Sequence, residues 1–366
     1  MTRRIAILTG GGDCPGLNAA IRGVVKASHG LGWDVVGIRC GFEGLLSPCD
    51  LLPLNLENTS GILTQGGTIL GAASSGRFSA KTGHGQAGQI PPELIAEAQS
   101  SMEHLGISAL IAAGGDGTLT IAQQFFEQGT SVVAIPKTID NDLQATVITF
   151  GFDSAVACAT DALDRLHSTA ASHGRVFVLE LMGRYAGWIA VHAGIAGGAD
   201  VILIPEIPFR YEAVARAIER REAAGRKFTL VVVAEGAREE GGDFAVKGPM
   251  RADKEAQLGG IGDQVAAEIK KRTGKETRCV VLGHLQRGGG PTTFDRLLAT
   301  RYGVAAVQMI AGGQFGMMAA LRPPDIVPVP IKEAIGKIRT VPPEGNVVST
   351  ARALGISLGA ASELAS

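Results

Sequence analysis

Cysteine is scarce in this sequence, and the few cysteines follow no pattern typical of a disulfide framework or a zinc site. The chain has five, an odd number, and no two of them form a C-x-x-C pair. Secreted disulfide scaffolds and zinc ribbons depend on such pairing. We therefore expect free thiols and a cytoplasmic protein.

Long hydrophobic runs are also missing. The most apolar stretch, residues 304–321, is interrupted by two glutamines and a pair of glycines, which makes it a poor transmembrane helix. We predict a buried helix, a break and a return toward the core. After Arg3 and Arg4 only a short apolar segment precedes three glycines, which argues against a signal peptide. No membrane partner is expected.

Neither sign of charge is in excess, with 34 basic and 35 acidic residues and a net charge of -1. This balance provides no overall attraction to nucleic acid, so any phosphate must be recognised by local clusters. Charged residues make up only 19% and hydrophobic ones 45%, which fits a chain that buries much of its surface. A length of 366 residues predicts two domains.

Apolar segments alternate with amphipathic ones. Residues 3–9 predict a strand, 10–16 a glycine turn, 17–32 a helix and 33–40 a second strand, which together make a βαβ unit. We expect an α/β fold with two Rossmann-like lobes, mainly parallel sheets and the active site in the cleft between the lobes. Further strands are predicted at 108–115, 131–136, 175–181 and 229–236.

The first glycine-rich turn, Thr9 to Gly16, lies between a predicted strand and a predicted helix. Glycines there let backbone N–H groups approach an anion, and the helix adds its positive end. The turn matches neither of the two common nucleotide fingerprints, G-x-x-x-x-G-K-[ST] and G-x-G-x-x-G. A plain tight turn is an equally good interpretation of this segment alone.

A second glycine-rich turn, Gly114 to Thr118, follows the strand predicted at 108–115. Its aspartate, Asp116, stands beside exposed backbone amides, which is what a complex of Mg²⁺ with phosphate requires. The alternative is that Asp116 only caps the helix that follows.

The segment PKTIDND, residues 136–142, places several charges at the end of an apolar strand. In an extended segment Asp140 and Asp142 would fall on the same side, so one could accept a proton while the other assists a metal. Lys137 would add positive charge toward a phosphate. The alternative is a polar turn in which Asn141 and the aspartates bond their own backbone.

A set of basic residues downstream suits a second phosphate, because several arginines around one dianion give both affinity and orientation. Any one of them alone could be a solvated surface charge or a salt-bridge partner. They are Arg175, Arg184, Arg278, His284 and Arg287.

Six segments in order resemble the 6-phosphofructokinase family over nearly the whole length. The resemblance implies phosphoryl transfer from ATP, with Mg²⁺, to the 1-hydroxyl of fructose 6-phosphate. It also implies a donor lobe, 1–150 plus about 288–322, and a sugar-phosphate lobe, 151–287 plus about 323–366. The segments are LTGGGDCPGLNAAIRGVV, GGDGT, PKTIDND, SHGRVFVLELMGRYAG, VVVAEG and ETRCVVLGHLQRGG.

The resemblance also implies a role for individual residues. Asp140 would be the general base, with Lys137, Thr138 and Arg184 as further catalytic residues, and Asp116 would hold Mg²⁺. A homodimer or homotetramer that shares substrate arginines between subunits is implied as well. The donor would be bound by Gly12, Arg77, Gly115, Asp116, Gly117 and Thr118. The sugar phosphate would be bound by Thr138, Asp140, Asp142, Arg175, Met182, Gly183, Arg184, Glu235, Arg278, His284 and Arg287.

At some positions the sequence departs from the pattern of the family that it resembles. Ser74 stands where ATP-using bacterial members commonly carry an arginine, and Arg77, three residues later, is the candidate replacement. His167 stands where an effector-binding arginine is expected, so the usual nucleotide activation is not predicted.

The choice of donor depends on two positions. Gly117 favours ATP, because a carboxylate there would face a nucleotide phosphate, whereas Lys137 is compatible with ATP or pyrophosphate. We predict ATP, with pyrophosphate as the alternative.

Two more remote functions share part of these features. GGDGT also occurs in NAD kinases and lipid kinases, but the set of arginines and the histidine suits a sugar phosphate better than a lipid or a dinucleotide. A non-catalytic nucleotide sensor would not need both Asp116 and Asp140.

Overall fold

The computed structural model describes residues 2–73, 76–78, 88–246 and 258–364, which form two compact units. Unit 1 consists of Met1–Ile139, Leu143–Ser154 and Arg287–Ile338. Unit 2 consists of Asp140–Asp142, Ala155–Gln286 and Arg339–Ser366.

Unit 1 is built on a seven-stranded sheet in the order β11-β10-β5-β4-β1-β2-β3. The two outer pairs, β2 with β3 and β10 with β11, are antiparallel, and the other neighbours are parallel. The strands are β1 (Arg4–Thr9), β2 (Asp34–Ile38), β3 (Leu51–Leu54), β4 (Ile107–Gly114), β5 (Val132–Pro136), β10 (Met317–Arg322) and β11 (Asp325–Pro330).

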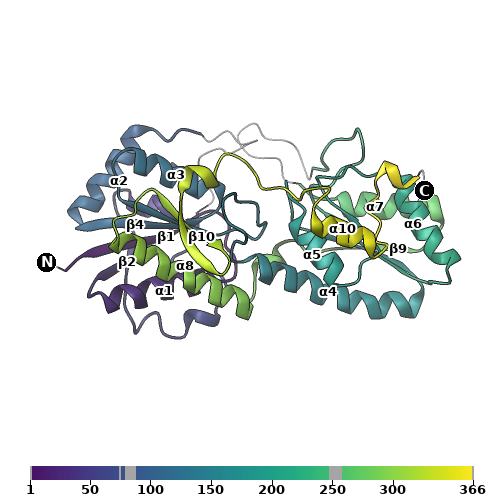
Figure 1. Cartoon of the computed structure of the whole chain (residues 1–366), viewed down its shortest axis with the longest axis horizontal. Coiled ribbons are helices and arrows are strands. Elements are labelled where there is room, and N and C mark those ends of the chain that lie inside the picture. The colour runs from purple at the N-terminus through teal and green to yellow at the C-terminus, as the bar shows by residue number, and fades with distance from the viewer. Residues whose placement is uncertain (1, 74–75, 79–87, 247–257, 365–366) are drawn as a thin grey trace. The chain divides into compact units, whose positions relative to one another are not determined.

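Helices cover both faces of this sheet (Figure 1). On one face lie α1 (Leu17–Gly30) and α8 (Thr293–Ala311), and on the other lie α2 (Pro92–His104) and α3 (Asp116–Glu127). Because both faces are covered, the central strands β4 and β5 are apolar and buried except at Ser108, as expected for a parallel sheet. The shorter helices are η1 (Gly41–Leu45), η2 (Ile62–Thr64) and α9 (Ile331–Ala334).

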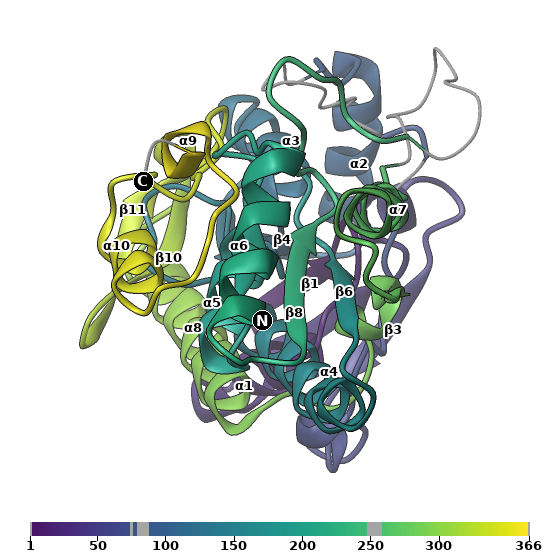
Figure 2. The same cartoon turned by 90° about the vertical axis from the view of Figure 1, so that its right-hand side faces the viewer.

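Unit 2 contains a four-stranded parallel sheet in the order β7-β8-β6-β9. On one face of this sheet lie α6 (Tyr211–Ala223) and α7 (Ile261–Thr273), as Figure 2 shows. Their buried side chains form a core with alternate strand residues. Between two such residues, Ile202 points the other way, toward α5 (Trp188–Ala196). The remaining elements are β6 (Val176–Leu181), β7 (Val201–Leu203), β8 (Thr229–Ala234), β9 (Thr277–Val281), α4 (Phe152–His173), α10 (Asn346–Ala353), η3 (Gly283–Arg287) and η4 (Ala361–Leu364).

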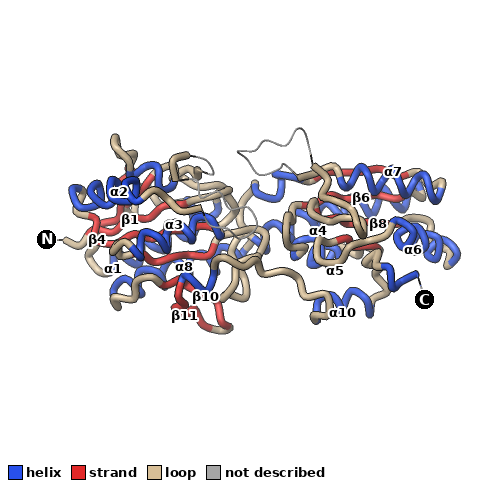
Figure 3. The backbone as a smooth tube through the Cα atoms, turned by 90° about the horizontal axis from the view of Figure 1, so that it is seen from above, coloured by secondary structure: helices blue, strands red, loops and turns tan. Residues whose placement is uncertain are grey.

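The predicted α/β class with mainly parallel sheets is confirmed, and Figure 3 shows strands flanked by helices in each unit. Residues 304–321 are the end of α8, a break and then β10, also as predicted. Residues 323–338 were expected in the second lobe but lie in unit 1, because β11 pairs with β10 and Ile331 is buried in the core of that unit. Among the described residues, none of the helices is both long enough and apolar enough to span a bilayer.

Candidate active site

The two glycine-rich turns of unit 1 lie side by side. They follow β1 and β4, which are parallel neighbours, so their carboxyl ends meet at one edge of the sheet. The amide of Gly10 donates a hydrogen bond to the carbonyl of Ala113 over 3.0 Å, which extends the pairing into the turns. Backbone amides from two turns are therefore available at one place for an anion.

Thr118 explains why both turns need glycine. A Cβ on Gly10 would lie 2.6 Å from the Oγ1 of Thr118, and a Cβ on Gly114 would lie 2.2 Å from its Cβ. The side chain of Thr118 is only 6% exposed, so it fills the space that the two missing side chains leave. The turns could not approach each other this closely with alanine at either position.

Asp116 is the first residue of α3, partly exposed at the start of the helix. Its Oδ1 accepts a hydrogen bond from the amide of Gly336 over 3.1 Å, which fixes the carboxylate. Within the described part of the chain, no three His, Cys, Asp or Glu side chains are grouped to hold a metal. Mg²⁺ does not require such a group, since it commonly takes one or two carboxylates, phosphate oxygens and water. One fixed carboxylate beside backbone amides fits that arrangement.

Lys137 brings a positive charge to the first glycine turn. Its side chain is buried, and its Nζ donates a hydrogen bond to the carbonyl of Gly12. Nearby, burial raises the pKa of the Cys14 thiol to about 12, although Lys137 acts in the opposite direction. Cys14 is therefore a neutral packing residue and no nucleophile.

Arg287 lies at the same turn. Its guanidinium donates a hydrogen bond to the carbonyl of Asp13 over 3.2 Å, and a Cβ on Gly12 would lie 2.8 Å from its Nη1. From the sequence, Arg287 is expected among the sugar-phosphate residues of the second lobe. In the structure Arg287 belongs to unit 1, because the chain returns to that unit at the end of η3.

The segment with the two aspartates is a turn, so its predicted extended form is wrong. Asn141 lies between Asp140 and Asp142 with a φ of +51° and is buried. Asparagine tolerates this left-handed conformation better than most residues. The argument that alternation puts both carboxylates on one side therefore does not apply, and Asp140 and Asp142 belong to unit 2 while Thr138 belongs to unit 1.

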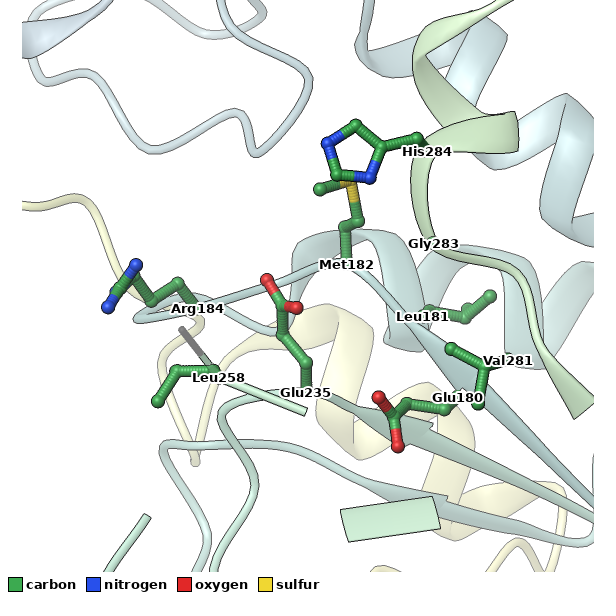
Figure 4. Close-up of a pocket in the computed structure, with 9 residues that line it drawn as sticks. All are labelled: Glu180, Leu181, Met182, Arg184, Glu235, Leu258, Val281, Gly283 and His284. Atoms are coloured by element: carbon green, nitrogen blue, oxygen red, sulfur yellow. The ribbon is translucent and has the colours of Figure 1, made fainter. Parts of the chain in front are cut away.

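A pocket of about 220 Å³ in unit 2 gathers predicted substrate residues at the carboxyl ends of β6, β8 and β9. Figure 4 shows Glu235 and Met182 between Arg184 on one side and His284 on the other. The arrangement offers a cation and an imidazole for a phosphate and a carboxylate for hydroxyl groups. The lining residues are Glu180, Leu181, Met182, Arg184, Glu235, Leu258, Val281, Gly283 and His284.

Two backbone contacts place Arg184 beside Glu235. The amide of Gly236 donates to the carbonyl of Gly183 over 3.1 Å, and a Cβ on Gly236 would lie 1.9 Å from the carbonyl oxygen of Arg184. Glycine at 236 thus lets the turns after β6 and β8 touch. Glu180, by contrast, accepts hydrogen bonds from backbone amides at the start of α7, the nearest over 2.7 Å, so this carboxylate serves the helix.

Arg175 and Arg278 lie at the opposite end of the same sheet. Both pair with Glu276, over 2.8 and 2.6 Å. Arg175 directly precedes β6, whereas Met182 directly follows it. At about 3.3 Å per residue, Arg175 lies roughly 17 Å before the pocket-lining Glu180, and Arg278 lies roughly 10 Å before the pocket-lining Val281. Neither arginine lines the pocket of its own unit.

Comparisons with known proteins identify the family of the chain. A family model described as Phosphofructokinase matches residues 4–310. The chain belongs to the phosphofructokinase family.

The relatives of this chain include enzymes named for ATP and enzymes named for pyrophosphate. The ATP-dependent 6-phosphofructokinase of Chloroflexus aurantiacus is 52% identical, covering 98% of each chain. The pyrophosphate–fructose 6-phosphate 1-phosphotransferase of Amycolatopsis methanolica is 50% identical, covering 93% of this chain and 97% of its own. The solved phosphofructokinase of Saccharomyces cerevisiae has a TM-score of 0.78 at 31% identity, covering 97% of this chain and 47% of that one.

A set of hydrogen bonds near the candidate site was not predicted from the sequence. Within unit 2 the amide of Arg339 donates to the carbonyl of Asp142 over 2.7 Å. The indole of Trp188 donates to the carbonyl of Arg339 over 2.8 Å, and the Arg339 guanidinium lies 4.8 Å above the indole ring. Glu206 accepts from the amides of Gly187 and Val341, over 3.0 and 2.7 Å.

Residues 339–341 therefore tie the turn at Asp142 to the segment that follows Arg184. Burial raises the pKa of the Glu206 carboxyl that completes this link. Nothing in the sequence singles out Trp188, since a lone tryptophan in an apolar helix is typical of a core residue.

Arg77, Gly115 and Gly117 are the other residues that were predicted to bind the donor. Arg77 is exposed and pairs with Glu97 on α2 over 3.3 Å. Its role as the donor-site arginine stays a prediction. Ser74 lies outside the described residues, and Gly115 and Gly117 flank Asp116 in the second turn, partly exposed.

Proposed function

We propose that this phosphofructokinase transfers the γ-phosphoryl group of ATP to the 1-hydroxyl of fructose 6-phosphate, forming fructose 1,6-bisphosphate and ADP. The observation that carries the acceptor is the pocket that joins Arg184 and His284 with Glu235. A cation and an imidazole suit the 6-phosphate, and a carboxylate suits the hydroxyl groups of the sugar. Family membership and ATP-dependent relatives at about half identity support the reaction.

Unit 1 binds the donor in this proposal. The glycine turns supply backbone amides for the phosphates, Lys137 adds a buried positive charge, and Asp116 holds Mg²⁺. When bound, the metal would neutralise charge on the donor phosphates. Gly12, Gly115, Gly117 and Thr118 line the phosphates, and Arg77 is assigned to the same site.

The chemical step needs a base at the sugar hydroxyl. Asp140 accepts the proton of the 1-hydroxyl as this oxygen forms its bond to the γ-phosphorus. The bond between the γ-phosphorus and its bridging oxygen breaks, and ADP leaves with the electron pair. Thr138 and Asp142 support the reacting groups.

ATP is the proposed donor because Gly117 puts no carboxylate against a nucleotide phosphate. Pyrophosphate is the second candidate. It is favoured by the 50% identical relative from Amycolatopsis methanolica and by Lys137, whose charge serves either donor.

A second copy of the chain completes the sugar-phosphate site in this proposal. Arg175 and Arg278 lie near the amino ends of β6 and β9, roughly 17 and 10 Å from the pocket-lining residues Glu180 and Val281 of these strands. Supplied by a neighbouring subunit, they would reach the phosphate from the open side. A homodimer or homotetramer follows. The free cysteines fit a cytoplasmic enzyme.

Product identification tests the reaction. Purified protein with fructose 6-phosphate, ATP and MgCl₂ should form a second phosphate ester at carbon 1, visible by ³¹P NMR. Chelation by EDTA should stop its formation. Glucose 6-phosphate and NAD serve as alternative acceptors, and phosphorylation of NAD in place of the sugar would refute the proposal.

A further inference from the structure

A second cavity, of about 640 Å³, lies in unit 1 and has no part in the proposed reaction. Its size is within the range of small-molecule sites. Three of its side chains are cationic and one is anionic, so the lining carries an excess of two positive charges. The lining residues are Gln144, Ala145, Arg322, Lys332, Glu333, Ile335, Gly336 and Lys337.

The three cations come from neighbouring elements and are exposed. Arg322 ends β10, Lys332 lies in α9, and Lys337 follows α9. None of them forms an ion pair with a carboxylate of the described residues, whereas Arg4, Arg175 and Arg278, near the ends of other strands, do. Three cations against the single carboxylate of Glu333 on one concave surface create a net positive potential there.

The wall of this cavity is bonded to one residue of the proposed active site, Asp116, and is held together by Gln144, two residues after Asp142. The amide of Gly336 donates to Asp116, the proposed metal-binding residue, over 3.1 Å. On the other side, Gln144 donates from its amide to the carbonyl of Ala334 and from its Nε2 to the carbonyl of Ile338, each over 3.3 Å. A shift of residues 334–338 would therefore change the hydrogen bonds of Asp116 and Gln144 together.

We propose that this cavity binds a small, multiply charged phosphate-bearing anion and that its occupancy regulates the donor site through residues 334–338. The regulatory part rests on the proposed function, since it assigns Asp116 to the donor. The binding part stands on the charge and shape of the cavity alone. A phosphate group provides the acceptor oxygens that lysine and arginine bind best.

Calorimetric titration with inorganic phosphate tests the binding. The double variant K332Q/K337Q should lose one class of phosphate sites, or bind there roughly tenfold or more weakly, because two of three cations are removed. The control is K270Q, an exposed lysine of α7 with no ion pair to a described residue. Any phosphate bound at the active site is common to all three proteins and cancels. Equal isotherms for wild type and the double variant would overturn the site.

Hydrogen exchange tests the regulation without requiring turnover. Phosphate should change the exchange rate of the Gly336 amide, which bonds Asp116, in wild type and not in K332Q/K337Q. In the same samples it should shift the KM for ATP and leave the KM for fructose 6-phosphate unchanged. Binding with unchanged exchange at residues 334–338 would refute the regulatory role. If no sugar is phosphorylated at all, the proposed function fails while the titration and the exchange data still decide on the anion site.

Discussion

The ammonium group of Lys137 donates a hydrogen bond to the backbone carbonyl of Gly12, 125 residues earlier in the chain. This contact joins the strand end after β5 to the first glycine turn, within unit 1. A buried lysine at this position keeps a fixed charge where amides of the turn are exposed, and a donor phosphate would use both. The electrostatic part of the proposed mechanism depends on this arrangement.

Replacement of Asp140 by asparagine should lower kcat by about a hundredfold or more, because the shape remains and the base is lost. The KM for fructose 6-phosphate should change little. Steady-state kinetics with both substrates varied provide the measurement, and Asp325→Asn, an exposed carboxylate of β11, is the control. A variant with the wild-type rate would remove Asp140 from the mechanism.

Gly117→Asp should raise the KM for ATP far more than the KM for fructose 6-phosphate, since a carboxylate would meet the nucleotide phosphates. The substitution suits the helix itself, because position 117 is in the first turn of α3, where an acidic residue is favourable. A loss of ATP use is thus separable from misfolding by thermal melting. Unchanged ATP kinetics would mean that this position does not face the nucleotide.

Arg184→Ala and Arg278→Ala should each inactivate the enzyme alone and complement each other when co-expressed. If a site combines Arg184 of one copy with Arg278 of another, a hybrid dimer has one intact site, and a random mixture recovers about a quarter of the wild-type activity. Activity of purified hybrids, separated by two affinity tags, is the measurement. If the hybrids recover no activity, the two arginines of a site do not come from different copies of the chain.

Gly114→Ala should destabilise unit 1 by roughly 1–3 kcal/mol, because its Cβ would meet Thr118 at 2.2 Å. Gly30→Ala is the matched control, since the end of α1 leaves open space around that position. Denaturant unfolding of both variants gives the comparison. Equal stabilities would contradict the close packing of the two glycine turns.

Asp295 provides a prediction on pH. It is fully buried in the first turn of α8, where its Oδ2 accepts hydrogen bonds from the amide and hydroxyl of Ser154, over 2.8 and 2.6 Å. Burial raises the pKa of its carboxyl to about 6. The carboxyl of the unfolded chain has an ordinary pKa near 4, so between about pH 4 and 6 the folded state binds a proton that the unfolded state does not. The free energy of unfolding therefore falls as the pH rises through this range.

The substitution Asp295→Asn keeps the shape of the side chain and removes its titratable carboxyl group. Relative to this variant, wild type should lose on the order of 2 kcal/mol of unfolding free energy between pH 4.5 and 7. Urea unfolding at the two pH values measures the difference, in which the other carboxylates cancel. A difference that does not depend on pH would show that Asp295 is already ionised at pH 4.5.

The strand ends of the site were predictable from the sequence because they are local patterns. The predicted segments at 3–9, 108–115 and 131–136 match β1, β4 and β5 to within one residue at each end, and each glycine turn lies where its strand ends. Parallel pairing then brings such ends together without further information.

Contacts between distant residues could not be read in the same way. The antiparallel β11 carries two prolines, which are tolerated at a sheet edge and conceal the strand pattern. The left-handed Asn141 turned a predicted extended segment into a turn. The link through Trp188, Arg339 and Glu206 uses backbone groups, which leave no signature in the sequence.

The most direct measurement of the central claim compares initial rates of fructose 6-phosphate phosphorylation with the magnesium complexes of ATP and of pyrophosphate. We expect a kcat/KM for ATP that exceeds the value for pyrophosphate by about tenfold or more. Equal or faster turnover with pyrophosphate would contradict the assignment of the donor, and no turnover with either would contradict the proposed reaction.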